Sequence, residues 1–290
     1  MYEADTRQRF IFENFDIRGD IVKLQKSYLE TVTGKHYPEA VARLLGEFLA
    51  ASALLSTTIK FDGRLVLQAR STGQVALLMA ECSSEGQLRG IARYADTPTS
   101  DQFTELLRDG TLVITIDSRK GEPYQGVVAL EGTSLSQCLE AYFRQSEQLG
   151  SLFTFASDGE GVAAMLLQQL PAQRQQDVDE RSESWQHTTT LARTLTAEEL
   201  LQLPNADILL RLYHQEELRV FPPRALAFGC SCNRERTARA ISALGREEIE
   251  SLIAERGGVE ISCEFCGTEY NFGPGELRLL FDQAEEGPTH

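Results

Sequence analysis

The sequence is poor in basic side chains. It contains 28 Lys and Arg against 43 Asp and Glu, which gives a formal net charge of -15 at pH 7. Binding to DNA or RNA needs Lys and Arg to neutralise phosphates and release counterions, so a nucleic-acid partner is disfavoured, and so is an anionic membrane surface. An acidic surface suits a soluble protein that stays dispersed while it holds sticky material.

Long hydrophobic runs are also missing. No apolar stretch approaches the roughly 18 residues of a membrane-spanning helix, and residues 1–6 lack the basic start and apolar segment of a secretory signal. We therefore expect an intracellular, cytoplasmic protein without membrane partners. In a reducing compartment, its six cysteines are expected to be metal ligands or redox thiols rather than structural disulfides.

Familiar catalytic patterns are absent too. The sequence shows no phosphate-binding glycine loop, no Ser-His-Asp set and no convincing pair of catalytic carboxylates, and His187 and His214 are isolated. We therefore expect that the protein is not an enzyme and that both histidines have surface or capping roles.

Residues 1–170 predict an α+β domain with a mainly antiparallel sheet. Short β-type runs are separated by Gly-containing turns, as in antiparallel sheets. A helix is expected after Pro38 and another after a Ser134 cap, and Arg18-Gly19-Asp20 is interpreted as a turn. The predicted strands cover 9–14, 64–70, 75–82, 87–94, 111–117, 125–130, 152–156 and 162–167.

Residues 171–229 predict a metastable helical linker. A polar segment follows Leu170, and short helices are then expected around Trp185, from Thr196 with a capping box to Glu199, and over 205–213. The few large apolar residues of these helices suggest that the linker depends on docking to its neighbours and could separate from them.

Residues 230–290 predict a small zinc-binding module. Cys230 and Cys232 are followed after thirty residues by Cys263 and Cys266, and Gly267 then allows a tight turn. Two chelating pairs of thiolates match the tetrahedral preference of zinc. Between them we expect a helix capped by Asn233 and a second helix over 246–256, and a β-hairpin is expected around the second cysteine pair.

The spacing alone leaves two roles open for this zinc. It could be a static staple, as in many Cys-rich ribbons. A redox switch is favoured because adjacent cysteines need little motion to form a disulfide, and because a small module takes much of its folding free energy from the metal. Cys82 and Cys138 lie in apolar strand and helix patterns, which predicts buried and inert thiols.

The chain resembles the 33 kDa chaperonin family, the redox-regulated heat-shock holdases of bacteria, over nearly its whole length. The cysteine spacing is the specific part of the resemblance. The residues that carry it are Cys230-Ser-Cys232 with Arg234-Glu235-Arg236, Cys263-Glu-Phe-Cys266-Gly267 with Tyr270-Asn-Phe272, Phe15-Asp-Ile-Arg18-Gly19, Trp185, Thr194-Leu195 and Glu199-Leu200.

The resemblance implies an ATP-independent chaperone of the bacterial cytoplasm that responds to oxidative stress. One zinc ion would be held by Cys230, Cys232, Cys263 and Cys266 in an inactive reduced form. Oxidants such as peroxide or hypochlorite would form the disulfides Cys230–Cys232 and Cys263–Cys266. Zinc release would then free the linker and expose apolar surface for unfolded client proteins, with a homodimer expected in the oxidised state.

Two other classes of protein remain as alternatives. A zinc-ribbon that binds nucleic acid would need a basic face, yet residues 230–290 hold about twice as many acidic residues as arginines. A thiol oxidoreductase would place its Cys-x-x-Cys at the start of a helix, whereas Cys263 and Cys266 lie between two predicted strands.

Overall fold

The computed structural model describes residues 5–57, 62–118 and 122–285. The chain divides into two compact units, Met1–Gly229 and Cys230–His290. None of the helices in the described ranges is long and apolar enough to cross a membrane. The mixed α+β class with antiparallel sheets is confirmed, and each strand predicted above is present with its ends shifted by at most three residues.

Two six-stranded sheets form the first unit. Sheet A has the order β10-β1-β2-β9-β8, with β11 paired to β1, and sheet B has the order β12-β5-β4-β3-β6-β7. Neighbouring strands are antiparallel except for β12 and β5. Sheet A contains β1 Thr6–Phe12, β2 Ile17–Leu24, β8 Ser151–Ser157, β9 Val162–Gln169, β10 Leu218–Val220 and β11 Arg224–Ala225. Sheet B contains β3 Gly63–Arg70, β4 Leu77–Ser83, β5 Gln87–Arg93, β6 Thr111–Ser118, β7 Tyr124–Ala129 and β12 Ala227–Phe228.

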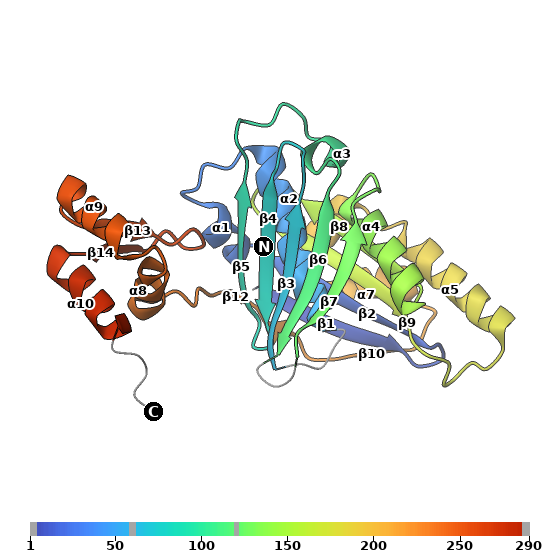
Figure 1. Ribbon diagram of the computed structural model, residues 1–290. Coiled ribbons are helices and arrows are strands. Elements are labelled where there is room, and N and C mark those ends of the chain that lie inside the picture. The colour runs from blue at the N-terminus through green and yellow to red at the C-terminus, as the bar shows by residue number, and fades with distance from the viewer. Residues whose placement is uncertain (1–4, 58–61, 119–121, 286–290) are drawn as a thin grey trace. The chain divides into compact units, whose positions relative to one another are not determined.

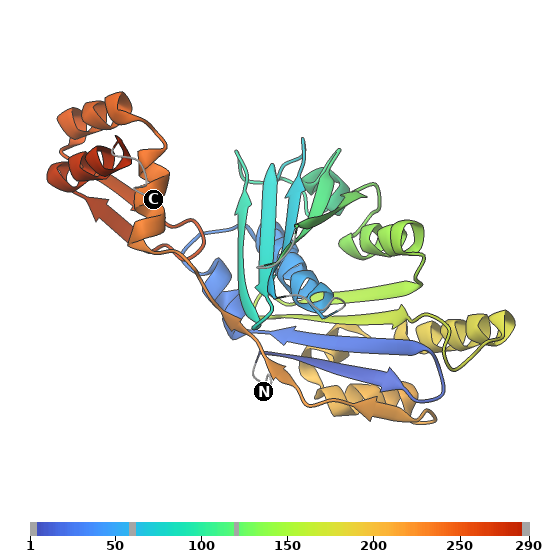
Figure 2. The ribbon, with the colours of Figure 1, turned by 60° about the horizontal axis from the view of Figure 1, so that its bottom comes forward.

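Helix α2 (Glu39–Leu55) lies between the two sheets (Figures 1 and 2). Pro38 occupies its N-cap position, as expected from a ring that suits a helix start but not a helix interior. Most of the helix is buried against both sheets, including Leu45, Phe48 and Leu49. The shorter helices before residue 170 are α1 Lys26–Val32, α3 Phe103–Leu106, α4 Leu135–Tyr142, whose Ser134 cap is confirmed, and the π-helical turn η1 Phe143–Glu147.

The predicted turn at Arg18-Gly19-Asp20 is wrong, because these residues lie inside strand β2. Gly19 pairs with Phe10 of β1, and the Phe10 ring lies 2.0 Å from the position that a Gly19 Cβ would take. Glycine is therefore required by a cross-strand ring and not by a change of chain direction. Helix α1 and the short strands β10, β11 and β12 were also not predicted.

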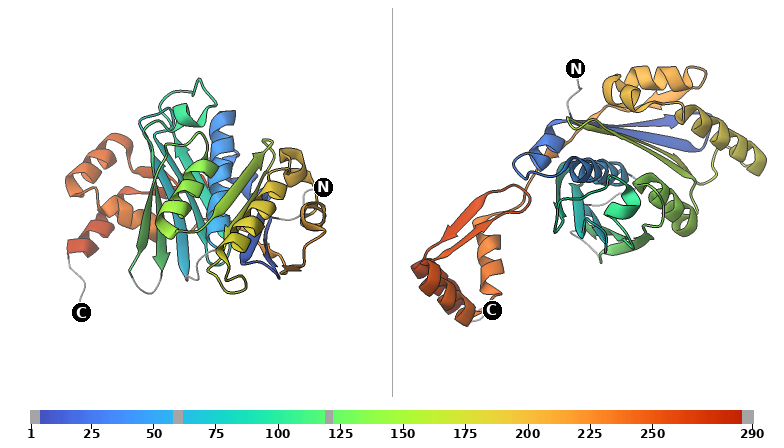
Figure 3. Two further views of the ribbon diagram at one scale, coloured as in Figure 1. Left: turned by 90° about the vertical axis from the view of Figure 1, so that its right-hand side faces the viewer. Right: turned by 90° about the horizontal axis from the view of Figure 1, so that it is seen from above.

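The helices of residues 171–229 pack on the face of sheet A that is turned away from α2 (Figure 3, right), and β10, β11 and β12 of the same segment pair with β1 and β5. This segment contains α5 Val178–Ala192, α6 Ala197–Gln202 and α7 Asn205–Tyr213, and the predicted capping box of Thr196 and Glu199 is present. The sequence of strand β9 explains why both faces of sheet A are covered. Its apolar residues follow one another without polar residues between them, so side chains on both faces need burial. Val162, Ala164 and Leu166 belong to the core around α2, whereas Ala163, Met165 and Leu167 pack with the linker helices.

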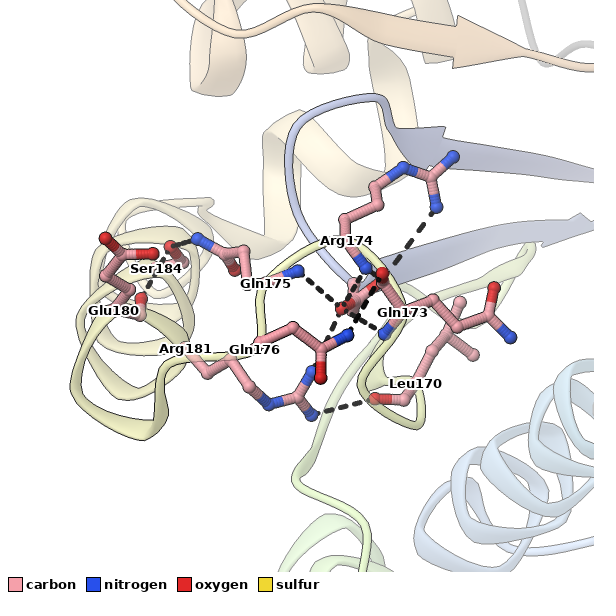
Figure 4. Close-up of polar contacts among 9 residues, drawn as sticks. Leu170, Gln173, Arg174, Gln175, Gln176, Glu180, Arg181 and Ser184 are labelled. Carbon is pink, nitrogen blue, oxygen red and sulfur yellow. Dashed lines mark hydrogen bonds and ion pairs between the residues drawn. The ribbon is translucent and has the colours of Figure 1, made fainter.

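The carboxylate of Asp16, in the β1–β2 turn, holds the beginning of the linker. Its side chain is 3% exposed. It accepts hydrogen bonds from the backbone N–H groups of Gln173 at 2.9 Å, Arg174 at 2.9 Å and Gln175 at 3.1 Å. Arg181 of α5 pairs with the same carboxylate at 3.1 Å and donates to the carbonyl oxygen of Leu170. The linker residues of this contact are shown in Figure 4. A buried charge with this many donors fixes residues 170–181 to sheet A.

We expect Asp16→Asn to lower the free energy of unfolding of the first unit by about 2–4 kcal/mol, because it leaves backbone donors and Arg181 without a charged partner. Burial raises the pKa of Asp16, but the N–H groups of residues 173–175 and Arg181 outweigh it and hold that pKa below its ordinary value. This stabilisation is therefore present at neutral pH and is lost only as pH falls through the lowered folded pKa. Urea unfolding at neutral and acidic pH measures the loss of stability and its pH dependence, and hydrogen exchange locates the loss in the chain.

Asp5→Asn is the matched control for this prediction. Asp5 also accepts three backbone hydrogen bonds, from Gln25, Lys26 and Ser27 at the start of α1. Both variants should be less stable, but only Asp16→Asn should speed amide exchange at residues 173–175. Equal exchange at these amides in the two variants would contradict the role given to Asp16.

The second unit, as far as residue 285, is built from three helices and a hairpin. These are α8 Arg234–Ser242, α9 Arg246–Arg256, β13 Val259–Ser262, β14 Glu269–Phe272 and α10 Pro274–Glu285. The predicted Asn233 cap is confirmed, and Gly257 ends α9 with φ of 74°. The buried apolar core of the described part of this unit is small, consisting of Ala238, Ile241, Ile249, Phe272 and Leu277.

Candidate metal centre

Two chain segments bring the four paired cysteines together. Cys230 and Cys232 precede α8, which starts directly after the Asn233 cap. Cys263 follows β13, and its backbone N–H donates to the carbonyl of Thr268, which closes the turn that carries Cys266. Gly267 lies in this turn with φ of 71°, a conformation that L side chains rarely adopt. The predicted tight turn at the second pair is therefore confirmed.

The four sulfur atoms form a compact cluster. All lie within 4.8 Å of one another, with Cys230 Sγ 3.6 Å from Cys263 Sγ and Cys232 Sγ 3.4 Å from Cys266 Sγ. A tetrahedral zinc with Zn–S bonds of about 2.3 Å would place its sulfurs about 3.8 Å apart. The thiol set thus fits zinc in ligand type, number and spacing, and each close contact joins one cysteine from each pair.

The electrostatics of the cluster favour a bound cation. Burial raises the pKa of Cys230 to about 12, and burial also raises the pKa of Cys263. Burial acts in the same direction on Cys266, but hydrogen bonds from Thr268 help to outweigh it and lower the pKa of Cys266 to about 6. Without a cation, Cys230 and Cys263 therefore stay protonated at neutral pH. A divalent metal would stabilise the fully deprotonated set.

Two hydroxyl groups contact the sulfurs. The Tyr270 hydroxyl donates to Cys232 Sγ at 3.1 Å, and the Thr268 hydroxyl lies 3.2 Å from Cys266 Sγ. The hydrogen bond to Cys232 and burial raise the pKa of Tyr270 to about 12. Sequence reasoning did not identify either residue as part of the site. The available signal was the position of Thr268 and Tyr270 in the sequence, two and four residues after Cys266.

Arg234 ties the elements around the site to one another. Its guanidinium donates to Glu276 of α10 at 2.9 Å and 2.6 Å and to the carbonyl oxygen of Asn271 in β14. It also lies over the ring of Phe272, 4.5 Å from the centroid. These contacts are exposed, so each contributes little to the stability of the module. Because the apolar core is also small, a bound metal would supply most of that stability.

The remaining candidates lie elsewhere. Cys82 and Cys138 are 0% and 2% exposed, which confirms the prediction that both thiols are buried. Burial raises the pKa of each thiol, which supports the prediction that they are inert. His187 lies 3.0 Å from Glu216, and His214 is the C-cap residue of α7. In the described parts of the chain, the four paired cysteines form the single cluster of potential metal ligands.

Known proteins are similar to this chain over nearly all of its length. The family model for the Hsp33 protein matches residues 5–273. The chain is 50% identical to a 33 kDa chaperonin of Pseudomonas aeruginosa, with 100% of this chain and 99% of the relative covered. It is 51% identical to a 33 kDa chaperonin of Azotobacter vinelandii, with 97% and 96% covered.

A solved structure shares the fold. The crystal structure of a 33 kDa chaperonin (heat shock protein 33 homolog) from Thermotoga maritima superposes with a TM-score of 0.82 at 21% sequence identity. The match covers 97% of this chain and 99% of that chain. At this identity the likeness concerns the fold alone.

Proposed function

The chain belongs to the Hsp33 family of chaperones, and on that premise we propose that it is a redox-regulated, ATP-independent holdase of the bacterial cytoplasm. In the reduced form, one zinc ion held by Cys230, Cys232, Cys263 and Cys266 keeps the protein inactive. Oxidation opens the zinc module and the linker, and the exposed apolar surface binds unfolding proteins. It acts as a binding protein without catalytic turnover.

The observation that carries this proposal is the position of four thiols within 4.8 Å in a module with a small core. Domains of about 60 residues bury too little apolar surface to be very stable alone. Structural zinc contributes about 10–16 kcal/mol of apparent binding free energy at neutral pH. A module that depends on four oxidisable ligands is thus stable when reduced and unstable when oxidised.

The redox step converts ligands into disulfides. In each pair, one thiolate attacks a peroxide oxygen and forms a sulfenic acid with release of hydroxide, and its partner then displaces a second hydroxide to form the disulfide. Two electrons pass from the two sulfurs to the cleaved O–O bond, and protons from solvent convert both hydroxides to water. Closure of Cys230–Cys232 and Cys263–Cys266 leaves no thiolate ligand for zinc.

The linker supplies the surface that opening would expose. Its buried apolar side chains face aromatic and aliphatic residues of sheet A, including Phe10, Phe12 and Met165. The large buried linker side chains in this interface are Leu195, Leu200, Leu201, Ile208, Leu209, Leu212 and Tyr213. Separation would uncover both halves of the contact, which would give an extended apolar site for unfolded chains. Strand β12, at the end of the linker, is separated from Cys230 by one residue.

Suppression of client aggregation tests the function. Light scattering from a thermally unfolding client should be unchanged by the reduced, zinc-loaded protein and strongly reduced by the peroxide-treated protein. Equal suppression of aggregation by both forms, or none by either, would mean that zinc has only a static structural role.

Sedimentation would show whether oxidation produces the proposed homodimer. Peptide mapping would distinguish neighbour disulfides from Cys230–Cys263 and Cys232–Cys266, whose sulfurs are also close.

Cys82→Ala and Cys138→Ala should each leave oxidant activation within about twofold of the unmodified protein. Both thiols are buried in the core around α2, so peroxide reaches them poorly, while removal of a small buried side chain costs about 1–2 kcal/mol of stability. Suppression of client aggregation after peroxide treatment measures the activation of each variant. Zinc content before treatment shows that the zinc module is intact. A variant that keeps its fold and zinc but is no longer activated would assign the switch to a different thiol.

A further inference from the structure

We propose that Tyr270 is a positioning residue whose hydroxyl sets how readily Cys232 reacts with an oxidant. This inference rests on the redox function proposed above and names a residue outside the four ligands that would control its sensitivity. The contact that carries it is the hydrogen bond from the Tyr270 hydroxyl to Cys232 Sγ, 3.1 Å long.

Secondary structure places this hydroxyl at the sulfur. Tyr270 lies in β14 opposite Ile261 of β13, and its ring packs against the small core that contains Ile241 and Phe272. The ring is thereby oriented by the hairpin and by the core together, so that its hydroxyl reaches Cys232, which is 38 residues distant in sequence. Tyr270 thus links the second half of the module to the first cysteine pair.

The two hydroxyl contacts fall on two sulfurs that lie close together. Cys232 Sγ and Cys266 Sγ are 3.4 Å apart, Tyr270 donates to the first of them, and the Thr268 hydroxyl lies 3.2 Å from the second. Donors directed at a thiolate draw electron density from it, and they also restrict the rotation of the side chain. Groups that support metal ligands in this way typically change metal affinity by about 10–100-fold when they are removed.

The same hydrogen bond should slow oxidation. A thiolate attacks peroxide through a sulfur lone pair, and a lone pair that accepts a hydrogen bond is less nucleophilic. Cys232 would therefore form its sulfenic acid more slowly while Tyr270 is in place, and the module would tolerate a higher oxidant concentration before its pairs close. Tyr270 would in this way raise the threshold for activation.

Tyr270→Phe tests the inference because it removes the hydroxyl and keeps the ring in the core. We expect zinc affinity about 10-fold lower, measured by competition with a chromogenic chelator. Zinc release at a fixed peroxide concentration should be several-fold faster, and so should modification of Cys232 relative to Cys230 by an alkylating reagent. The relative modification is an internal ratio that general loosening of the module would move much less.

Tyr124→Phe is the matched control, since its hydroxyl lies in the first unit and donates to Glu147. This variant should release zinc at the unmodified rate. Zinc affinity, release rate and the Cys232-to-Cys230 ratio all unchanged within twofold in Tyr270→Phe would overturn the proposal. These readouts need no client, so they remain decisive even if the oxidised protein suppresses no aggregation and the proposed function fails.

Discussion

The double variant Cys263→Ser, Cys266→Ser is expected to hold no zinc and to leave residues 230–285 unfolded, while sheet B and α2 of the first unit keep their fold. Serine hydroxyls are poor zinc ligands, and the remaining Cys230 and Cys232 supply only half of a tetrahedral site. Most of the roughly 10–16 kcal/mol of apparent metal-binding free energy would be lost. The small apolar core of the module cannot supply a stabilisation of that size.

Zinc content per chain and amide exchange measure this outcome. The reduced unmodified protein should contain one zinc ion per chain, and the variant close to none. Ser262→Ala, which changes an exposed neighbour of Cys263, should retain both the metal and the fold. Full zinc retention in the double variant would falsify the ligand assignment.

Oxidation of the unmodified protein should open the linker together with the zinc module. Helices α6 and α7 continue through β10, β11 and β12, short strands that pair with β1 and β5, into Cys230. Loss of order in the module removes the folded anchor that follows these short strands. The helices themselves are short, which makes them unstable once they leave sheet A. Their amides should exchange at least about a hundredfold faster in the oxidised form, as expected for local opening.

Hydrogen exchange on both redox forms provides the measurement and its control. The pairing of β3 with β4 and β6 lies in sheet B, away from the linker face of sheet A, and its amides should stay protected in both forms. The Asp16 contact should make residues 173–175 the slowest part of the linker to open. If protection were lost only in residues 230–285 while client binding appeared, the linker would not control access.

Local signals allowed much of the structure to be predicted. Ser134, Thr196 and Asn233 each begin a helix as expected, because a side-chain oxygen that accepts a backbone N–H acts within three residues. The alternation of short apolar runs and Gly-containing turns was sufficient to predict the positions of the main antiparallel strands. The two cysteine pairs predicted the cluster itself, because paired thiols at this spacing are uncommon without a metal.

Other features depended on residues distant in the sequence. Gly19 was assigned to a turn because the residue that requires it, Phe10, contacts it only across the β1–β2 pairing. Asp16 reaches Gln173 over 157 positions, and no local pattern marks either residue as a partner of the other. The chain order likewise does not show that α2 lies between two sheets, since this arrangement follows from which apolar faces meet.

The sequence by itself thus determined the two cysteine pairs, the helix starts and the antiparallel character of the first unit, because each of these depends on neighbours a few residues apart. Only the tertiary structure decided which surface the linker covers and which hydroxyl contacts Cys232. Both are set by packing in three dimensions: β9 has apolar side chains on both faces, and the hairpin and small core orient Tyr270.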